Sequence, residues 1–239
     1  GVKIDPTRVR KDFSANLPDV TAPTGKAIEL GILDADFTLP RVGDTPGTNG
    51  RYLYRTASVK LDTAGSLLVA GPVDLIVVGD TTVAGEGIIA VGNETVTDAS
   101  LKLYTSGNVN LTNKGGKNHH HHPVALSIYG TAVTKTKSSQ SIKIEHDEEF
   151  YGMIYAPNAS LTLTSGGDIY GAAVAKTITL SKKATLHYDV QLASTPSPFA
   201  LQGSSSETMR LNGWAELTQA PGSGLPFARD NRPPFNTLF

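Results

Sequence analysis

The sequence contains no cysteine, one tryptophan and only two methionines. The lack of cysteine excludes disulfide bonds, thiol catalysis and thiolate metal sites, although it does not indicate the redox compartment. Charged residues make up 18% of the chain, below the roughly 25% of an average globular domain. The net charge of -1 gives no electrostatic basis for binding nucleic acid or an anionic membrane. No apolar run approaches the roughly 18 residues that a membrane-spanning segment needs.

Short alternating strands dominate the region after residue 50. Two stretches, VDLIVVGDTTVAGEG (73–87) and LKLYTSGNVNLTNKG (101–115), align without gaps. Apolar residues two apart lie on one side of a strand, and matched glycines mark corners, often with positive φ. The repeat therefore predicts parallel coils stacked on one another. Its matched pairs are Val73 with Leu101, Leu75 with Leu103, Gly79 with Gly107, Val83 with Leu111, and Gly87 with Gly115.

A second repeat lies between Phe150 and Asp189. IYAPNA (154–159) is answered by IYGAAV (169–174), and SLTL (160–163) by TITL (177–180). The first match predicts that Tyr155 and Tyr170 stack between coils. In the same region, Asn158 is expected to turn a corner through its own side-chain hydrogen bonds.

These patterns predict an all-β protein built as a single β-solenoid of parallel coils over residues 51–192. A β-sandwich is the competing fold, but it does not require matched corners. Residues 1–50 carry five prolines and are expected to be an extended segment that covers the solenoid, or an arm that contacts a neighbouring subunit. Residues 112–123 are expected to be a loop. Residues 193–239 form a Pro/Ser-rich connection and an extended C-terminal tail.

The motifs YGMIYAPNA, IYGAAVAKTITL and LHYD, preceded by GPVDLIVVGDTTVAGEG, resemble a known family pattern. It is an uncharacterised β-solenoid domain of bacterial exported, surface-associated and type IV pilus-related proteins, including pilin-like ones. The resemblance covers about residues 50–192 and implies a right-handed parallel β-helix, broadly like the bactofilins. It brings no catalytic residues with it. Pilin-like members carry an apolar N-terminal helix that this chain lacks, so direct membrane insertion is not expected here. Because the chain begins at Gly1, we expect a processed or truncated product.

Four consecutive histidines are the most conspicuous polar cluster. Imidazole nitrogen binds zinc, nickel or copper, and neighbouring subunits could be bridged through such an ion. Consecutive residues in a strand point to opposite faces, however, so four in a row do not converge easily. A solvated loop or a short engineered tag is the competing interpretation, and no cofactor is expected beyond an adventitious or bridging divalent metal. The candidate metal ligands are His119, His120, His121 and His122.

Two other clusters resemble catalytic groups. EHDEE (145–149) could supply paired carboxylates, but its acids lie in a single run, as in a solvated turn. His187 and Asp189 could form a dyad, but no serine motif accompanies them. We therefore expect these two residues to cap the last coil, and we do not expect an enzyme.

The sequence favours a non-enzymatic structural protein, located extracellularly or on the bacterial cell surface. It would serve as a surface or filament subunit, pilus-like, that binds copies of itself or other surface and pilus components. A tail rich in apolar aromatic residues is expected to dock on another subunit. The alternatives are an adhesin-like module that binds glycans or surfaces, and a carbohydrate-active enzyme. An exposed row of Tyr, Asn and Thr across coils would favour the adhesin. The expected assembly contacts are Phe227, Phe235, Leu238 and Phe239.

Overall fold

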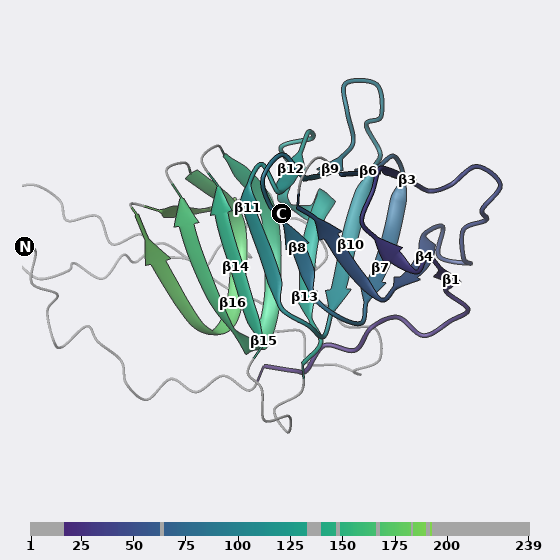
Figure 1. The fold of residues 1–239 in the computed structure, drawn as a ribbon. Coiled ribbons are helices and arrows are strands. Elements are labelled where there is room, and N and C mark those ends of the chain that lie inside the picture. The colour runs from purple at the N-terminus through teal and green to yellow at the C-terminus, as the bar shows by residue number, and fades with distance from the viewer. Residues whose placement is uncertain are drawn as a thin grey trace, which may run out of the picture. The chain divides into compact units, whose positions relative to one another are not determined.

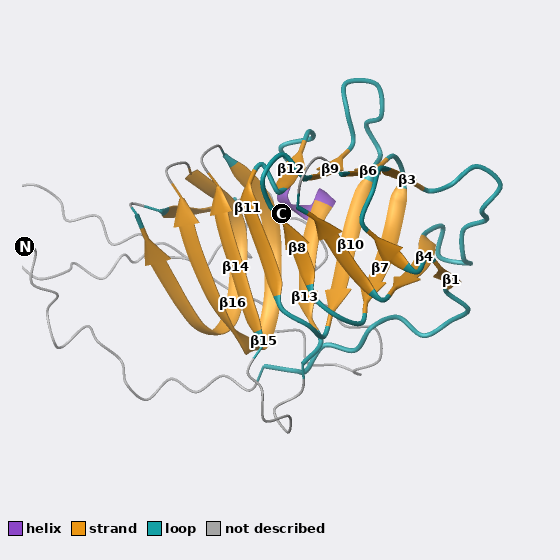
Figure 2. Ribbon diagram, in the orientation of Figure 1, coloured by secondary structure: helices purple, strands orange, loops and turns teal. Residues whose placement is uncertain are grey.

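The computed structural model of the chain describes residues 17–62, 65–132, 140–146, 149–165, 168–182, 184–189 and 192. All of these belong to one compact unit within residues 1–206. Short strands make up most of it, together with one 3-10 turn, η2 (Pro123–Ala125) (Figure 2). Within the described residues, no helix has the length and apolarity that a membrane crossing needs. The strands are β1 (Ile28–Glu29), β2 (Ile32–Leu33), β3 (Phe37–Leu39), β4 (Tyr52–Thr56), β5 (Ser58–Leu61), β6 (Ser66–Val69), β7 (Pro72–Val77), β8 (Thr81–Val83), β9 (Ile88–Val91), β10 (Ser100–Thr105), β11 (Val109–Asn113), β12 (Gly116–Asn118), β13 (Leu126–Gly130), β14 (Ser141–His146), β15 (Phe150–Ser165), β16 (Asp168–Ser181) and β17 (Thr185–Tyr188).

The strands stack in three parallel ladders, which we call walls. Wall 1 runs β1-β4-β7-β10-β13 and continues through the first part of β15 and β16 to β17. Wall 2 runs β2-β5-β8-β11-β14 and continues through the second part of β15 and β16. Wall 3 is the separate sheet β3-β6-β9-β12. Figure 1 shows strands of the large sheet side by side, with β3, β6, β9 and β12 following one another along one edge. The all-β, all-parallel solenoid expected from the sequence is confirmed.

The core is a column of apolar side chains that point inward from the walls. In wall 1, Tyr54 pairs with Leu75, Leu75 with Leu103, and Leu103 with Ile128, and all four side chains are buried. Burying one such side chain fully contributes about 1.5–3 kcal/mol. Where wall 3 ends at β12, the fully buried ring of Phe150 packs against Gly116 and Gly152 and fills the space.

The corner glycines are required for close approach between coils. A Cβ atom on Gly79 would lie 2.7 Å from the carbonyl oxygen of Ala57, and one on Gly107 would collide with the backbone of Gly79. The sequence suggested positive φ at such corners, but neither residue has it. Positive φ occurs instead at Gly85 and Asn113, and the Asn113 amide donates a hydrogen bond to the Gly85 carbonyl at 3.2 Å. The corners thus depend on tight stacking between coils.

The two predicted repeats differ in how accurately they predict which residues pair between neighbouring strands. The pairs Val73–Leu101 and Val83–Leu111 are confirmed, and so is the match of SLTL with TITL, since Ser160 pairs with Thr177. The Ile-Tyr match is wrong, because Ile169 pairs with Phe150 and Tyr170 with Tyr151. A bulge between Ala156 and Ser160 gives β15 extra residues relative to β16.

Two further assignments from the sequence change. The expected loop at 112–123 contains the end of β11, all of β12 and the start of η2. The parallel ladders also begin earlier than residue 51, because β1, β2 and β3 pair with β4, β5 and β6. Residues 28–39 therefore form the first coil that the structure describes.

The segment just before β1 crosses the outer face of wall 1. Val20 is buried against Tyr129 and Tyr155. The Tyr155 hydroxyl donates a hydrogen bond to the Pro18 carbonyl at 3.0 Å, and the Asn158 amide donates one to Asp19 at 2.6 Å. Asn158 also donates to the Ala132 carbonyl at 2.9 Å. The segment from residue 17 to β1 thus covers an outward row of tyrosines.

Candidate functional site: the two ends of the solenoid

The end of the solenoid at β1–β3 is closed. Leu33 and Leu39 are completely buried although they belong to the first described coil. The Tyr54 ring also fills the core here. Its hydroxyl donates to an Asp44 carboxylate oxygen at 2.7 Å and accepts from the Arg41 backbone amide at 3.2 Å. Arg41 is in turn paired with Asp44 at 3.0 Å. The chain between β3 and β4 therefore caps this end with satisfied polar groups.

Electrostatics support this cap. Burial, together with the hydrogen bond to Asp44, raises the pKa of Tyr54 to about 12. The hydrogen bonds from Arg41 and Tyr54 hold the pKa of Asp44 below its ordinary value. The phenol stays neutral and the carboxylate stays charged over the whole physiological range. The cap therefore does not change its charge there.

At the opposite end, wall 2 finishes at β16 among the described residues. β17 pairs only with the start of β16, residues Asp168–Gly171. Residues 177–181 of β16 pair with β15 on one side, and no described strand pairs with them on the other. Ile178 and Leu180 are 43% and 49% exposed, although they stack over the fully buried Leu161 and Leu163. We call residues 177–181 the open edge.

A ladder of stacked rings lies on the outer face near this end. Tyr151 stacks on Tyr170 with ring centroids 4.8 Å apart, and His187 stacks on Tyr170 at 4.9 Å. His121 stacks on Tyr151 at 4.7 Å. These spacings equal the separation of neighbouring strands, so the stack of Tyr151, Tyr170 and His187 follows directly from the register. The match FYG (150–152) with IYG (169–171) carried this signal, but sequence analysis paired Tyr170 with Tyr155 instead.

Carboxylates line the ladder. The Tyr151 hydroxyl donates to Glu149 at 2.7 Å, and this bond, with burial, raises the pKa of Tyr151 to about 12. Asp168 accepts a hydrogen bond from Thr185 and lies 3.3 Å from His187 Nε2. Hydrogen bonds from Thr185 and His187 hold the pKa of Asp168 below its ordinary value. Sequence analysis assigned His187 and Asp189 to capping of the last coil: His187 lies against Asp168 and Tyr170, and the Asp189 backbone amide donates to the Gly171 carbonyl at 3.4 Å.

The histidine run forms a tight turn after β12. The Asn118 side chain organises it, since its amide donates to the His122 carbonyl at 2.7 Å and its oxygen accepts from the His120 amide at 3.1 Å. His121 stacks outward on Tyr151. Burial and the neighbouring charge of Lys117 lower the pKa of His119. In the part of the chain that the structure describes, no three His, Cys, Asp or Glu side chains converge as metal ligands.

The EHDEE run divides between two faces. His146 is buried and accepts a hydrogen bond from the Gly116 amide at 3.3 Å, beside the Phe150 ring. Glu145 lies outside, bonded to Lys143 at 2.7 Å and Lys182 at 2.6 Å. Asp147 and Glu148 are outside the described residues. The carboxylates of Glu145 and Glu149 serve different contacts and form no shared acid–base pair.

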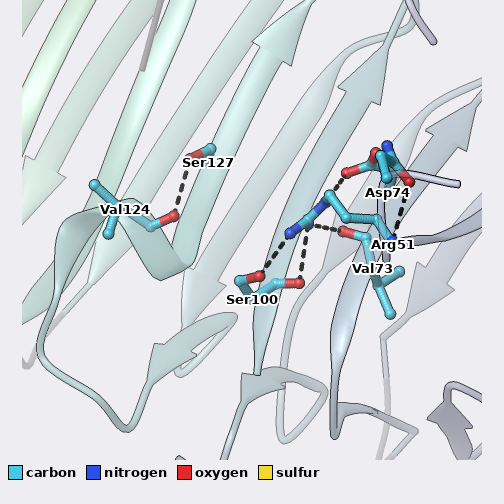
Figure 3. A network of polar contacts seen from close by, with 7 residues as sticks. Arg51, Val73, Asp74, Ser100, Val124 and Ser127 are labelled. Carbon is cyan, nitrogen blue, oxygen red and sulfur yellow. Dashed lines mark hydrogen bonds and ion pairs between the residues drawn. The ribbon is translucent and has the colours of Figure 1, made fainter. Parts of the chain in front are cut away.

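A largely buried ion pair joins three coils of wall 1. Arg51 Nε lies 2.6 Å from Asp74, and its other nitrogens donate to the Val73 carbonyl at 2.7 Å and to the Ser100 hydroxyl at 2.9 Å (Figure 3). Asp74 lies next to Lys102 in the ladder register. Burial and the charge of Arg51 lower the pKa of Lys102. All donor groups point at neighbouring coils, so we assign this network to stability.

The fold and these sites define a parallel β-solenoid that is capped at the β1–β3 end and whose last described strand of wall 2 has an exposed edge. Residues 21–195 match the family described as Domain of unknown function (DUF7305), and the chain belongs to that family. No curated protein matches the chain. No solved structure matches it either. The expected assembly residues Phe227, Phe235, Leu238 and Phe239 lie outside the described residues.

Proposed function

We propose that the protein is a non-enzymatic structural subunit of the bacterial cell surface, and that it assembles with copies of itself. The open edge carries this proposal. An edge strand with free N–H and C=O groups and exposed apolar side chains is a template for an added strand. Extracellular location follows from the resemblance to exported, pilus-related proteins.

The occupant we propose for the open edge is the C-terminal tail of a second copy, within residues 221–239. This segment carries Phe227, Phe235, Leu238 and Phe239, and such apolar content would be costly to leave in water. Five residues of edge need about five residues of tail. The final FNTLF (235–239) has that length and alternates, with Phe235, Thr237 and Phe239 on one side of an extended strand.

The asymmetry of the two ends favours one mode of assembly. Simple end-to-end stacking needs two open ends, and the β1–β3 end is closed by the Tyr54–Asp44–Arg41 cap. Addition of a strand from a tail needs only one open edge. We therefore infer a chain of subunits in which each tail reaches the open edge of the next one.

The test compares three variants by light scattering and negative-stain microscopy. Deletion of residues 221–239 is expected to abolish assembly, and so is Ile178→Lys, which puts a charge on the apolar side of the edge. Thr179→Lys is the matched control, since Thr179 is an exposed neighbour on the outward side of the same strand. It should assemble as the parent does. Normal assembly of the deletion or of Ile178→Lys overturns the proposal.

The ring ladder favours a second function, glycan binding, because it aligns Tyr and His side chains across coils. Ring faces inside the ladder are covered by their neighbours, so sugar rings cannot stack on them. Binding would have to use the exposed rim of phenol hydroxyls and carboxylates at Tyr151, Glu149 and Asp168. Calorimetry with soluble polysaccharides on the parent and on Glu149→Gln tests this function. Equal binding by both proteins excludes the rim.

A further inference from the structure

An apolar row crosses the outer face of wall 1, from β7 to β16. The register pairs Tyr104 with Tyr129 and Tyr129 with Tyr155, and the first two rings stack with centroids 4.9 Å apart. An aliphatic side chain continues the row at each end. A contiguous apolar patch on the outside of a soluble protein marks an interaction surface. We call this patch the tyrosine row, and its members are Ile76, Tyr104, Tyr129, Tyr155 and Val174.

The chain covers the tyrosine row with its own residues 17–25, which we call the strap. Near its start, the Pro18 carbonyl accepts a hydrogen bond from Tyr155 on β15. At its other end, a Cβ atom on Gly25 would lie 3.3 Å from the Leu53 side chain on β4. The strap therefore runs across the strands of wall 1, from β15 back to β4, as the purple trace that leads to β1 in Figure 1.

A bulge in β15 supplies the polar part of this contact. The register shifts between Ala156 and Ser160, and Asn158 lies in the shifted stretch. Its amide donates to the Ala132 carbonyl at 2.9 Å, which orients it, and to the Asp19 carboxylate of the strap at 2.6 Å. Bulges re-aim side chains in this way beside functional sites. The tyrosine row thus has a fixed polar donor at one end in addition to its rings.

The strap is held less firmly than any coil. Residues 17–27 form no strand, so no backbone ladder holds them, and Val20 is the single buried side chain among them. The chain then bends at Gly25, just before β1 enters the ladder. Segments with few buried apolar contacts open locally while the rest of a fold stays intact. The strap can therefore leave the tyrosine row without unfolding the coils.

We propose that two copies exchange their straps, so that residues 17–25 of one subunit dock on the tyrosine row of the other. Each strap makes the same contacts in both arrangements, so the exchange costs little beyond association itself. The short connection to β1 favours closure within one chain in dilute solution, and exchange therefore rises with protein concentration. The contact uses neither the open edge nor residues 221–239. It goes beyond the proposed function by adding a second surface through which copies bind.

Cysteine crosslinking tests the exchange, because the chain has no native cysteine. Asp19→Cys with Asn158→Cys places two thiols where the native side chains lie 2.6 Å apart, within reach of a short bis-maleimide. Asp19→Cys with Arg55→Cys is the matched control. Arg55 lies in line with the tyrosine row, but it is four strands from Tyr155, or about 19 Å.

Unlabelled and nitrogen-15-labelled copies of each double variant are mixed before crosslinking, and mass spectrometry distinguishes mixed links from links within one chain. In dilute solution we expect links within one chain for the first pair. In concentrated solution its mixed links should become at least tenfold more frequent, whereas those of the control pair should stay rare. Mixed links that are no more frequent in the first pair than in the control at any concentration overturn the exchange.

A change in the strap itself tests whether the tyrosine row is the docking surface. Val20→Asp, added to the first pair, puts a charge against the rings and should lower the yield of mixed links at least tenfold. Thr21→Asp is the matched control at an exposed neighbour. Equal yields with the two changes overturn the assignment of the row.

Deletion of residues 221–239 separates this inference from the proposed function. Mixed links should persist in the deletion variant, and their loss would overturn a contact that is independent of the tail. If mixed links are absent from the full chain while the deletion still abolishes assembly, the exchange is wrong and the proposed function stands.

Discussion

At the scale of single residues, polar side chains join coils that the backbone ladders already hold in register. Arg51 is the strongest case. It reaches Asp74 and Val73 in the next coil and Ser100 in the one after, and both members of the ion pair are largely removed from solvent. Breaking a buried pair is costly because the remaining charge is left without a partner.

We expect Arg51→Ala to lower the free energy of unfolding by about 3 kcal/mol, since the buried Asp74 side chain would lose its partner. Arg51→Lys keeps the charge but loses the planar fork of donors, so it should lose less. Urea unfolding followed by circular dichroism measures both. Replacing Arg51 and Asp74 together with Met and Leu should recover most of the loss. A loss below about 0.5 kcal/mol for Arg51→Ala would show that the network contributes little, as surface pairs do.

Glu145 makes the stability of the fold depend on pH, because its carboxylate is paired with two lysines in the folded state. Hydrogen bonds from Lys143 and Lys182 hold its pKa at about 2, below the ordinary value of 4.5. A carboxyl whose pKa is lower in the folded state stabilises the fold above its unfolded pKa, and the contribution is lost as pH falls. We expect the melting temperatures of the parent and of Glu145→Gln to differ at pH 6 and to converge between pH 4.5 and 2. A constant difference over that interval would contradict this assignment.

At the scale of the element, the corners determine how closely coils can approach. A methyl group on Gly107 would collide with the Gly79 backbone, which cannot move aside as a flexible side chain can. We expect Gly107→Ala to cost about 2–3 kcal/mol, in the range of overpacked cores. Gly47→Ala is the matched control, because its Cβ would meet the Asn49 side chain at 3.3 Å and the Arg51 carbonyl oxygen at 3.5 Å, without a collision. Differential scanning calorimetry of both variants checks the difference. Equal melting temperatures would show that the corners are not tight.

The sequence predicted the elements where its own pattern repeats with constant length. Gly79 and Gly107 mark equivalent corners, so the coils between them aligned correctly and gave the parallel stack. The bulge in β15 broke that constancy, and a chance likeness of IYAP with IYGA then outweighed the true match of FYGM with IYGA. β1–β3 were missed because strands of two or three residues between prolines carry too little alternation to recognise.

The candidate sites were less predictable from the sequence than the strands were. The open edge lies in TITL, which the sequence had already placed as a strand, but exposure of Ile178 depends on where the next coil stops. The sequence also predicted that Tyr170 stacks on another ring, but it did not identify Tyr151 and His187 as the rings on either side. His121 comes from a turn after β12 and reaches Tyr151 only because Asn118 holds that turn. A contact of this kind, between segments far apart in the chain, leaves no local pattern in the sequence.

At the scale of the whole solenoid, each coil is stabilised only by its neighbours, so stability should fall toward an end that nothing covers. At the β1–β3 end Leu33 and Leu39 are buried beside the contact of Tyr54 with Asp44, whereas Ile178 and Leu180 on the open edge are largely exposed. In an assembly that edge would gain a partner, and its amide hydrogens would become protected from exchange. Protection should therefore depend on protein concentration at one end alone.

We expect amide exchange, followed by mass spectrometry of peptic peptides, to slow at least tenfold in residues 177–181 when the protein is concentrated enough to assemble. Residues 168–171 are the internal control, because β17 covers them in every state and their exchange should not change. The deletion of residues 221–239 should remove the concentration dependence. Slowing at β1–β3 instead of at the open edge would place the contact between subunits at the closed end and contradict the polarity of assembly proposed above.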